Sequence, residues 1–242
     1  MIRIISIVVA TLLFCYIVFV SFFFREIRQD SICQDLQVVV KDSLDKHFVS
    51  ESDLVSILKK AGLDPIKRPM ADVNTDRIET ELLKNEMIAQ VEAYKTPSGI
   101  IKLEVMQKMP ILRIMGVRGS YYVDNLGTTM PISRRYAAHV PIVSGYGKKE
   151  LAVTDLYKFA LFLQENEFWN DQIEQIYVYP DNDIELIPRV GNHRIMLGTL
   201  DEFEEKLANL KLFYEQAIPK VGWEKYSMIN LKYKNQIVCT KK

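Results

Sequence analysis

Residues 4–24 read IISIVVATLLFCYIVFVSFFF and contain no charged side chain. A helix of this length reaches roughly 30 Å, the thickness of the hydrocarbon core of a bilayer. A cleaved secretory signal is the alternative, but its apolar core spans about 7–15 residues and leads to small residues at a cleavage site. This segment is longer and ends in three phenylalanines followed by Arg25. The sequence therefore favours an uncleaved transmembrane helix at residues 4–24.

The orientation of this helix is only weakly marked by charge. Arg3 precedes it, and Arg25 and Arg28 follow it, so the positive-inside rule gives almost no preference. A very short amino-terminal tail more often stays in the cytoplasm while a long carboxyl-terminal part is exported. We therefore expect a cytoplasmic tail at residues 1–3 and export of the chain beyond residue 24.

The part of the chain beyond the helix is nearly neutral, because it holds all 31 acidic residues and every basic residue except Arg3. Such a balance provides no basic surface for nucleic acid. Its length suits one large domain or two small ones. Three cysteines, Cys15, Cys33 and Cys239, are too few for a disulfide-built fold. Cys33 and Cys239 either pair in an oxidising compartment or remain single buried thiols, and the second interpretation is favoured.

Residues 25–115 are interpreted as a charged neck followed by a small domain. Ser50 and Asp53 have the spacing of a capping box, and Gly62 is placed to end that helix in the left-handed conformation. Two helices that cover one face of a three-stranded sheet would bury both of their apolar stripes. The expected elements, in order, are a strand at 36–40, a helix from Ser50, a helix from Asn74, and strands at 88–94 and 100–106.

Residues 116–242 form the second predicted domain, which is rich in strands. Apolar residues spaced three and four apart predict a helix at 156–163. Residues 199–202 match a capping box, so a long helix is expected to begin there. The expected strands are 121–124, 128–131, 140–145, 173–179, 183–190, 194–197, 228–233 and 236–240. The predicted fold class is α+β: one transmembrane helix, a small βααββ domain, and a mixed β-sheet domain with two helices.

The sequence offers no motif for catalysis or metal binding. His47, His139 and His193 are far apart, and none has a second ligand at metal-binding spacing. Ser144 lacks the glycine two residues earlier that a nucleophile elbow requires. Asp124 precedes a turn and is expected to bond the backbone of that turn. We therefore expect no catalytic residue, metal site, cofactor or small-molecule substrate, and a protein that is not an enzyme.

Two segments of the second domain carry a family likeness, YVDNLG at residues 122–127 and PIVSG at residues 141–145. With the order of the other parts, they make the chain similar to the FtsQ family of bacterial cell-division proteins, called DivIB in some bacteria. The first domain resembles a POTRA domain. The likeness covers nearly the whole chain, and its further segments are residues 48–58, 78–91, 99–105 and 110–114.

This resemblance implies a non-enzymatic scaffold at the division septum, anchored in the inner membrane with most of the chain in the periplasm. Proteins of the family hold the small coiled-coil division proteins FtsB and FtsL and lie beside the septal peptidoglycan synthase machinery. The POTRA-like domain would recruit or stabilise partners near the membrane. One departure is the almost absent cytoplasmic tail, residues 1–3, which leaves little room for contacts inside the cell.

The last strands are the expected partner-binding region. A final strand has a free edge that an extended partner segment can join. The lysines in this region have two possible roles, because they either block the edge or favour an acidic partner segment. The family resemblance favours binding. The residues expected to bind the partner are Ile229, Asn230, Leu231, Lys232, Tyr233, Lys234, Gln236, Ile237 and Val238.

Two other functions stay open on the sequence. The chain is alternatively a single-POTRA anchor of another envelope assembly, such as one for protein export. It is also compatible with an anchored envelope hydrolase whose site the sequence does not mark.

Overall fold

The computed structural model describes residues 11–20, 31–42, 47–116 and 119–242. The chain divides into two compact units, Met1–Gln107 and Lys108–Lys242. Strand β4 (Pro110–Gly116) thus belongs to the second unit, whereas the sequence placed the boundary after residue 115. The physical reason is pairing, because β4 forms ladders with two strands of the second unit.

Residues 11–20 form a helix whose apolar side chains are exposed, including Leu12, Phe14 and Phe19. Within the described residues, no helix combines the length and the apolar character needed to cross a membrane. The predicted transmembrane segment, residues 4–24, extends beyond this helix at both ends. Residues 4–10 and 21–24 of that prediction lie outside the described residues.

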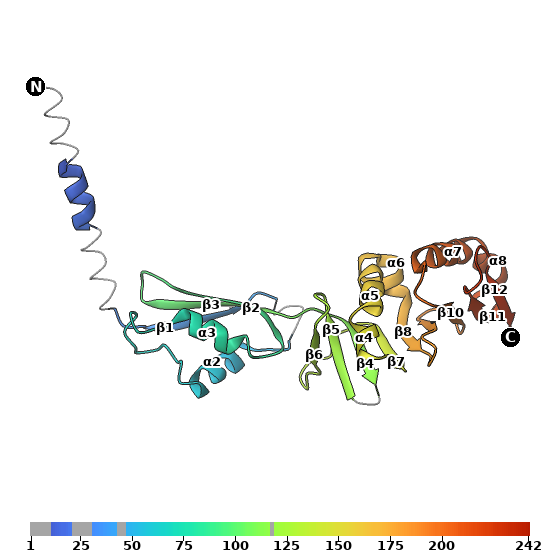
Figure 1. Ribbon diagram of the computed structural model, residues 1–242, viewed down its shortest axis with the longest axis horizontal. Helices are drawn as coiled ribbons and strands as arrows, with labels where there is room; N and C mark the ends of the chain where they lie inside the picture. The colour runs from blue at the N-terminus through green and yellow to red at the C-terminus, as the bar shows by residue number, and fades with distance from the viewer. Residues whose placement is uncertain (1–10, 21–30, 43–46, 117–118) are drawn as a thin grey trace, which may run out of the picture. The chain divides into compact units, whose positions relative to one another are not determined.

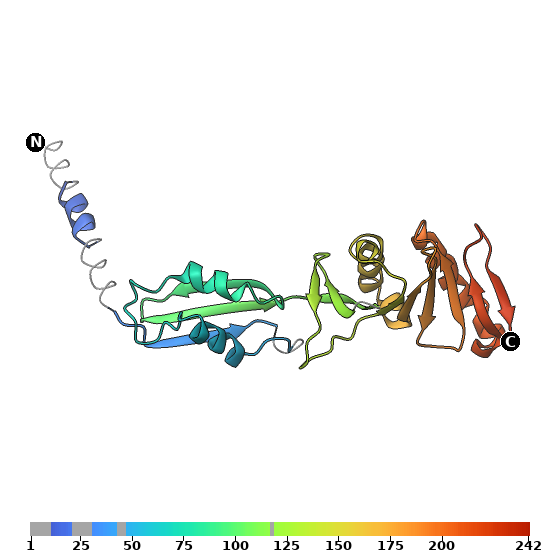
Figure 2. The same ribbon diagram turned by 60° about the horizontal axis from the view of Figure 1, so that its bottom comes forward.

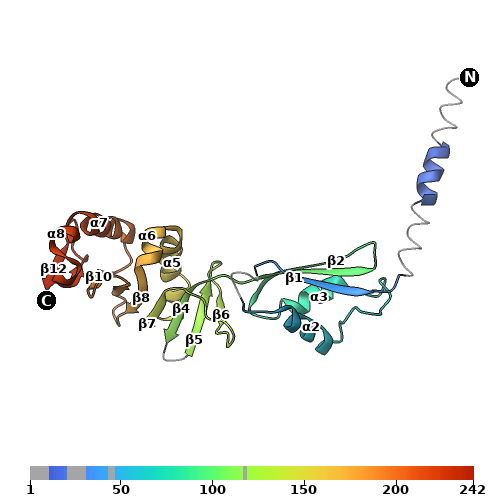
Figure 3. The ribbon, with the colours of Figure 1, turned by 180° about the vertical axis from the view of Figure 1, so that it is seen from behind.

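The first unit has the predicted order of strand, helix, helix, strand, strand. Its three-stranded sheet has the order β1-β3-β2, with β1 parallel and β2 antiparallel to the central strand β3. Both helices lie on the same side of this sheet (Figures 1 and 3). The elements are β1 (Asp35–Val40), α2 (Glu51–Lys60), α3 (Thr75–Leu82), β2 (Ile88–Lys95) and β3 (Ile100–Gln107).

Local sequence signals account for the helices of this unit. Ser50 and Asp53 form the capping box that the sequence predicts, and Asn74 caps α3 through its side chain. Gly62 follows α2 with a φ of 69°, as expected of a left-handed residue after a helix. The core lies between the helices and β3, and its fully buried side chains are Leu54, Leu58, Ile78, Leu82, Ile101, Leu103 and Val105.

The second unit is built on one mixed sheet of nine strands, in the order β12-β11-β10-β9-β8-β7-β4-β5-β6. The pairs β4–β7, β7–β8 and β10–β11 are parallel, and the remaining pairs are antiparallel. The strands after β4 are β5 (Gly119–Asp124), β6 (Thr129–Pro131), β7 (Ile142–Gly145), β8 (Ile173–Val178), β9 (Ile184–Pro188), β10 (Arg194–Gly198), β11 (Tyr226–Asn230) and β12 (Val238–Lys241).

More helices accompany this sheet than the two that the sequence predicted. The short helices have no clear signal in the sequence, because three to six residues are too few to show helical periodicity. Helices α5, α6 and α7 lie on one side of the sheet (Figures 1 and 3). The helices of the described second unit are α4 (Lys149–Ala152), α5 (Asp155–Glu165), α6 (Glu167–Gln172), α7 (Phe203–Gln216), α8 (Ile218–Val221) and the 3₁₀ helix η1 (Trp223–Lys225).

The start of α7 differs from the prediction. The helix begins at Phe203, and the capping box expected at residues 199–202 does not form. Instead, the hydroxyl of Thr199 bonds the carboxylate of Asp201 at 2.9 Å, and the capping residue Glu202 has a left-handed φ of 53°. The chain therefore turns sharply before the helix, and its first turn has no side-chain cap.

Candidate functional site

The buried acid Asp124 is a structural residue, as the sequence predicted. Its carboxylate accepts the backbone N–H groups of Leu126 at 3.0 Å and Thr128 at 2.7 Å, and it pairs with Lys108 at 3.2 Å. Burial alone would raise the pKa of Asp124, but these hydrogen bonds hold it below its usual value. The backbone contacts hold the turn between β5 and β6, and Lys108 joins this turn to the segment before β4. In the described part of the chain, no three His, Cys, Asp or Glu residues gather as metal ligands do.

The feature of the second unit most suited to binding is its last strand, β12. This strand pairs antiparallel with β11 and has no described strand on its other side (Figure 2). An unpaired sheet edge presents backbone N–H and C=O groups in a row, which is a template for an added strand. The edge of β12 is therefore the candidate site.

Two hydrogen bonds establish which groups of β12 face outward. The N–H of Leu231 bonds the carbonyl of Met196 of β10, so Met228 and Asn230 of β11 point their main-chain groups toward β12. At the other end, beyond a β-bulge between Tyr226 and Met228, the N–H of Lys242 bonds the carbonyl of Lys225. Both observations turn the main-chain groups of Val238 and Thr240 toward β11. The main-chain groups of Cys239 and Lys241 therefore face the free edge.

The side chains of this edge carry little charge. Ile237 and Cys239 pack against the core of the unit, whereas Val238 and Thr240 are exposed on the other face. Burial raises the pKa of the Cys239 thiol, so it stays neutral at pH 7. The run from Gln236 to Thr240 contains no charged residue. Nothing in this run carries the charge that proteins commonly place on an exposed strand edge.

Two other sheet edges, β6 and β2, are blocked by specific groups. In the second unit, the opposite edge strand β6 has three residues and ends in Pro131, and both features discourage pairing. In the first unit, the N–H of Ala93 on edge strand β2 is taken by the carboxylate of Glu79 at 2.7 Å. The open edge of β12 is thus a distinctive feature of its sheet.

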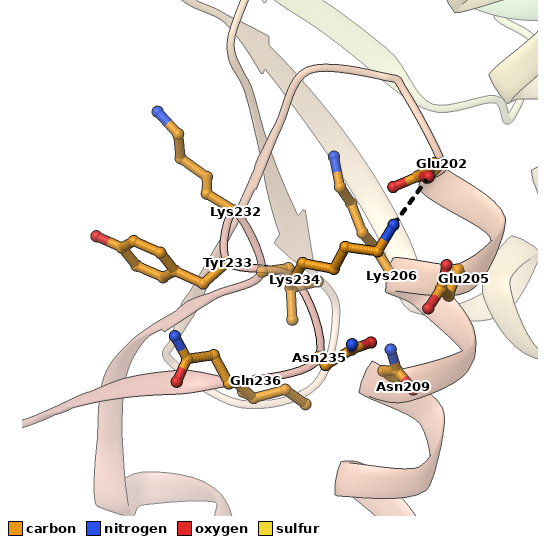
Figure 4. Close-up of a pocket in the computed structure, with 11 residues that line it drawn as sticks. Glu202, Glu205, Lys206, Asn209, Lys232, Tyr233, Lys234, Asn235 and Gln236 are labelled. Carbon is orange, nitrogen blue, oxygen red and sulfur yellow. Dashed lines mark hydrogen bonds and ion pairs between the residues drawn. The ribbon is translucent and has the colours of Figure 1, made fainter.

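A hollow lies beside the segment that leads into β12 (Figure 4). The amino-terminal half of α7 forms one wall, and the loop between β11 and β12 forms the other. Lys206 bonds the carbonyl of Thr199 at 2.8 Å, and burial lowers its pKa. The described residues that line the hollow are Glu202, Glu205, Lys206, Asn209, Leu231, Lys232, Tyr233, Lys234, Asn235, Gln236 and Ile237.

The lysines of this region are paired within the chain. Lys232 reaches Asp183 at 2.5 Å, and its stem lies over Gly198, where an added Cβ would come within 2.8 Å of it. Lys234 reaches Glu202 at 3.4 Å, and Lys242 reaches Glu224 at 2.6 Å. These ion pairs weaken the expectation that the lysines select an acidic partner, because the charges of Lys232, Lys234 and Lys242 are already neutralised locally.

The predicted partner-binding residues fall into three places. Ile229 and Asn230 lie in β11, which is an inner strand, and Ile229 is fully buried. Leu231 through Ile237 form the connecting segment, where Leu231 is buried and Tyr233 is exposed. Val238 lies in the edge strand itself. Cys239 and Lys241 are not among the predicted residues. Alternation along the strand does not reveal their outward direction, which follows from the pairing of β11 with β10.

A buried histidine supports the strands behind this edge. His193 is 2% exposed, its Nε2 lies 2.6 Å from the hydroxyl oxygen of Tyr214, and its ring stacks on Trp223. Its Nδ1 has no hydrogen-bond partner in the described structure. Burial lowers the pKa of His193 and raises that of Tyr214, so both groups are neutral at pH 7. Trp223 opens η1, which leads directly into β11.

Comparison with known proteins agrees with the division into two units. A family model described as FtsQ/DivIB, C-terminal related, matches residues 109–240, and a POTRA-like domain model matches residues 31–106. The cell division protein FtsQ of Rhodothermus marinus is 24% identical over 181 residues, which cover 69% of this chain. The match covers 65% of that relative, so it spans slightly less than two thirds of the relative's length.

Proposed function

Because the chain belongs to the FtsQ/DivIB family of cell-division proteins, we propose that it is a non-enzymatic scaffold of the bacterial division complex. In this role it holds small coiled-coil division proteins of the FtsB and FtsL type at the septum, beside the septal peptidoglycan synthase machinery. The match of the family model to the second unit and of the POTRA-like model to the first supports this role.

The proposal includes a membrane anchor at residues 4–24. The uncharged run in that segment supports the anchor, since its length suits a bilayer. Residues 1–3 then lie in the cytoplasm, and both folded units lie in the periplasm. Protease added to spheroplasts should therefore degrade the folded units, and protection that ends only on lysis would refute this orientation.

The observation that carries the binding role is the open edge of β12. An extended segment of the partner joins this edge as an additional strand, so main-chain hydrogen bonds from Cys239 and Lys241 supply affinity. Alternate side chains of the partner strand supply selectivity. The uncharged run before Lys241 favours a partner segment with small or β-branched residues, because such residues suit pairing on a pleated surface.

The hollow beside β12 completes the proposed binding site. A partner strand that runs along β12 places its flanking residues near the wall formed by α7. Leu231 and Ile237 offer apolar contact there, and Asn209 and Asn235 offer hydrogen bonds. The exposed ring of Tyr233 is available at the rim, where it is 52% exposed. Tyrosine suits such a position because it combines apolar area with a polar end.

Depletion in cells tests the function directly. A division scaffold predicts filamentous cells with unconstricted septa, and a fluorescent fusion of the full chain should collect at division sites. An anchor of an export assembly predicts normal division with loss of exported proteins. Uniform membrane fluorescence together with normal division would refute the proposed role.

A further inference from the structure

Strand β1 is the second open edge in the described structure, and it belongs to the first unit. It pairs with β3 on one side and has no described strand on the other (Figure 2). The run Gln37 to Val40 is uncharged, and Val39 is 50% exposed. On the other edge of this sheet, Glu79 takes the N–H of Ala93, and at the start of β1 the carboxylate of Asp35 takes the N–H of Leu36, so the open part of β1 lies beyond Leu36.

The hydrogen bonds at the two ends of β1 show which groups of the strand face outward. The N–H of Lys41 bonds the carbonyl of Val105 of β3, whereas the N–H of Leu36 bonds the carboxylate of Asp35 at 2.9 Å. Main-chain groups alternate along a strand. Leu36, Val38 and Val40 therefore point their main-chain groups away from β3.

The open part of this edge has defined limits. At its start, Lys67 and Arg68 occupy the edge beside Cys33. At its end, the N–H of Lys41 turns inward to the carbonyl of Val105, and the chain enters a turn at Lys41 and Asp42. An added strand must therefore fit between Asp35 and Lys41.

A second copy of β1 meets these limits in one antiparallel register. The outward-facing main-chain groups of one copy must lie opposite the outward-facing groups of the other copy. This is possible only when the two-fold axis passes through a residue of β1. With the axis at Val38, the two Val38 residues form a reciprocal hydrogen-bonded pair, and on each side of the axis the N–H of Val40 meets the carbonyl of Leu36 of the partner copy. Asp35 then opposes Lys41 of the partner copy at each end, so opposite charges meet twice.

The neighbouring registers fit less well. An axis at Gln37 would place Lys41 of the partner copy opposite Cys33, where Lys67 and Arg68 already lie. An axis at Val39 would set Leu36 opposite Asp42, which lies in the turn after the strand, and would separate Asp35 from Lys41 of the partner copy. A one-residue slip is also excluded, because it would set outward groups against inward ones.

From this self-complementarity we propose that the chain forms a homodimer through antiparallel pairing of β1 with β1 of a second copy, centred on Val38. The pairing joins two three-stranded sheets into one six-stranded sheet. It covers Val39 with Gln37 of the other copy and brings the two Val38 side chains together. Lys41, which already bonds Glu104 at 2.6 Å, then lies between that carboxylate and Asp35 of the other copy.

Cysteine cross-linking of the full chain in its membrane tests the dimer. In a background with Cys15, Cys33 and Cys239 replaced by serine, Val38→Cys places two thiols on a hydrogen-bonded pair with Cα atoms about 5.5 Å apart, which suits a disulfide. Mild oxidation should convert most of the protein to a covalent dimer. Gln90→Cys, exposed on the opposite edge strand β2, should yield at least fivefold less. Equal yields from both variants, or no dimer from Val38→Cys, would overturn the proposal.

Charge reversal gives a second readout that does not depend on the thiol chemistry. Asp35→Lys in the Val38→Cys background should lower the cross-linking yield about fivefold, since two cross-strand pairs become repulsive. Adding Lys41→Glu should restore the yield. A double variant that melts like the parent yet stays at the low yield would refute the register. Melting curves of each variant identify any that lose the fold, because Lys41→Glu also places a carboxylate beside Glu104.

Discussion

The carboxylate of Glu79, on α3, accepts the backbone N–H of Ala93, on edge strand β2, at a distance of 2.7 Å. A helix side chain thus takes the place of a neighbouring strand at this edge. The contact joins Glu79 and Ala93, which are 14 residues apart, and occupies a main-chain donor that is otherwise open to pairing. It also ties α3 to the sheet that it covers.

Glu79→Ala should loosen β2. The N–H of Ala93 would lose a charged acceptor, and hydrogen bonds to charged groups contribute about 1.5–3 kcal/mol. Hydrogen exchange of the peptide that spans β2 should therefore speed up by at least tenfold, while peptides of the second unit keep their rates. Glu79→Gln retains an acceptor oxygen and should show a smaller change. Equal protection in both variants and the parent would show that the contact does not stabilise the strand.

Leu58→Ala tests the core of the first unit. Leu58 is 1% exposed on the inner side of α2, so truncation leaves a cavity and should cost about 2–5 kcal/mol in the free energy of unfolding of that unit. Leu83, which follows α3 and is 47% exposed, offers a matched control. Leu83→Ala should change the unfolding midpoint little. Similar losses for the two variants in denaturant titrations would contradict the assigned helix faces.

His193 should make the second unit sensitive to acid. Its pKa in the folded state is lowered by burial below the usual value of 6.5, so the unfolded state binds more protons at mildly acidic pH. Stability is therefore fully present above about pH 6.5 and falls as the pH drops toward the folded-state pKa. The charged groups nearest to the ring are Glu224, which opposes the shift, and Lys242, which adds to it.

The measurement is the melting temperature of the second unit between pH 7.5 and pH 5. The parent should lose stability over this range, and His193→Phe should lose less, because it removes the group that takes up the proton. His139→Gln, at an exposed position, should behave like the parent. A parent and a His193→Phe variant with the same pH profile would exclude His193 as the source.

The helices and strands of the first unit could be predicted from the sequence, because the residues that determine each of them are close together in the chain. The capping box at Ser50, the cap at Asn74 and the glycine at Gly62 lie within one turn of the helix ends that they define. The alternation of buried and exposed residues in β3 is equally local. Each of these patterns is contained in a few consecutive residues, so reading them needs no knowledge of the tertiary structure.

The candidate site could be predicted only in part from the sequence, because it depends on strand pairing between segments that are distant in the chain. The parallel pairing of β11 with β10 makes β11 an inner strand, and nothing within residues 226–230 indicates that neighbour. The ion pair of Lys232 with Asp183 likewise joins residues far apart in the chain. The predicted list therefore includes inner residues such as Ile229 and omits Cys239, whose outward N–H follows from the strand order.

Proline substitutions in β12 distinguish the N–H groups that face the free edge from those that pair with β11. Cys239→Pro removes an N–H that faces outward, so the ladder with β11 stays intact and the domain should remain folded, as is usual for proline on an edge strand. Binding of an FtsB-type partner should fall at least tenfold in a pull-down, because the added strand loses a main-chain donor. Thr240→Pro removes an N–H that points to β11 and should instead lower the melting temperature. Cys239→Ala keeps the N–H and serves as the control for the side chain. If Cys239→Pro is folded and binds the partner as well as Cys239→Ala, strand addition at β12 is excluded.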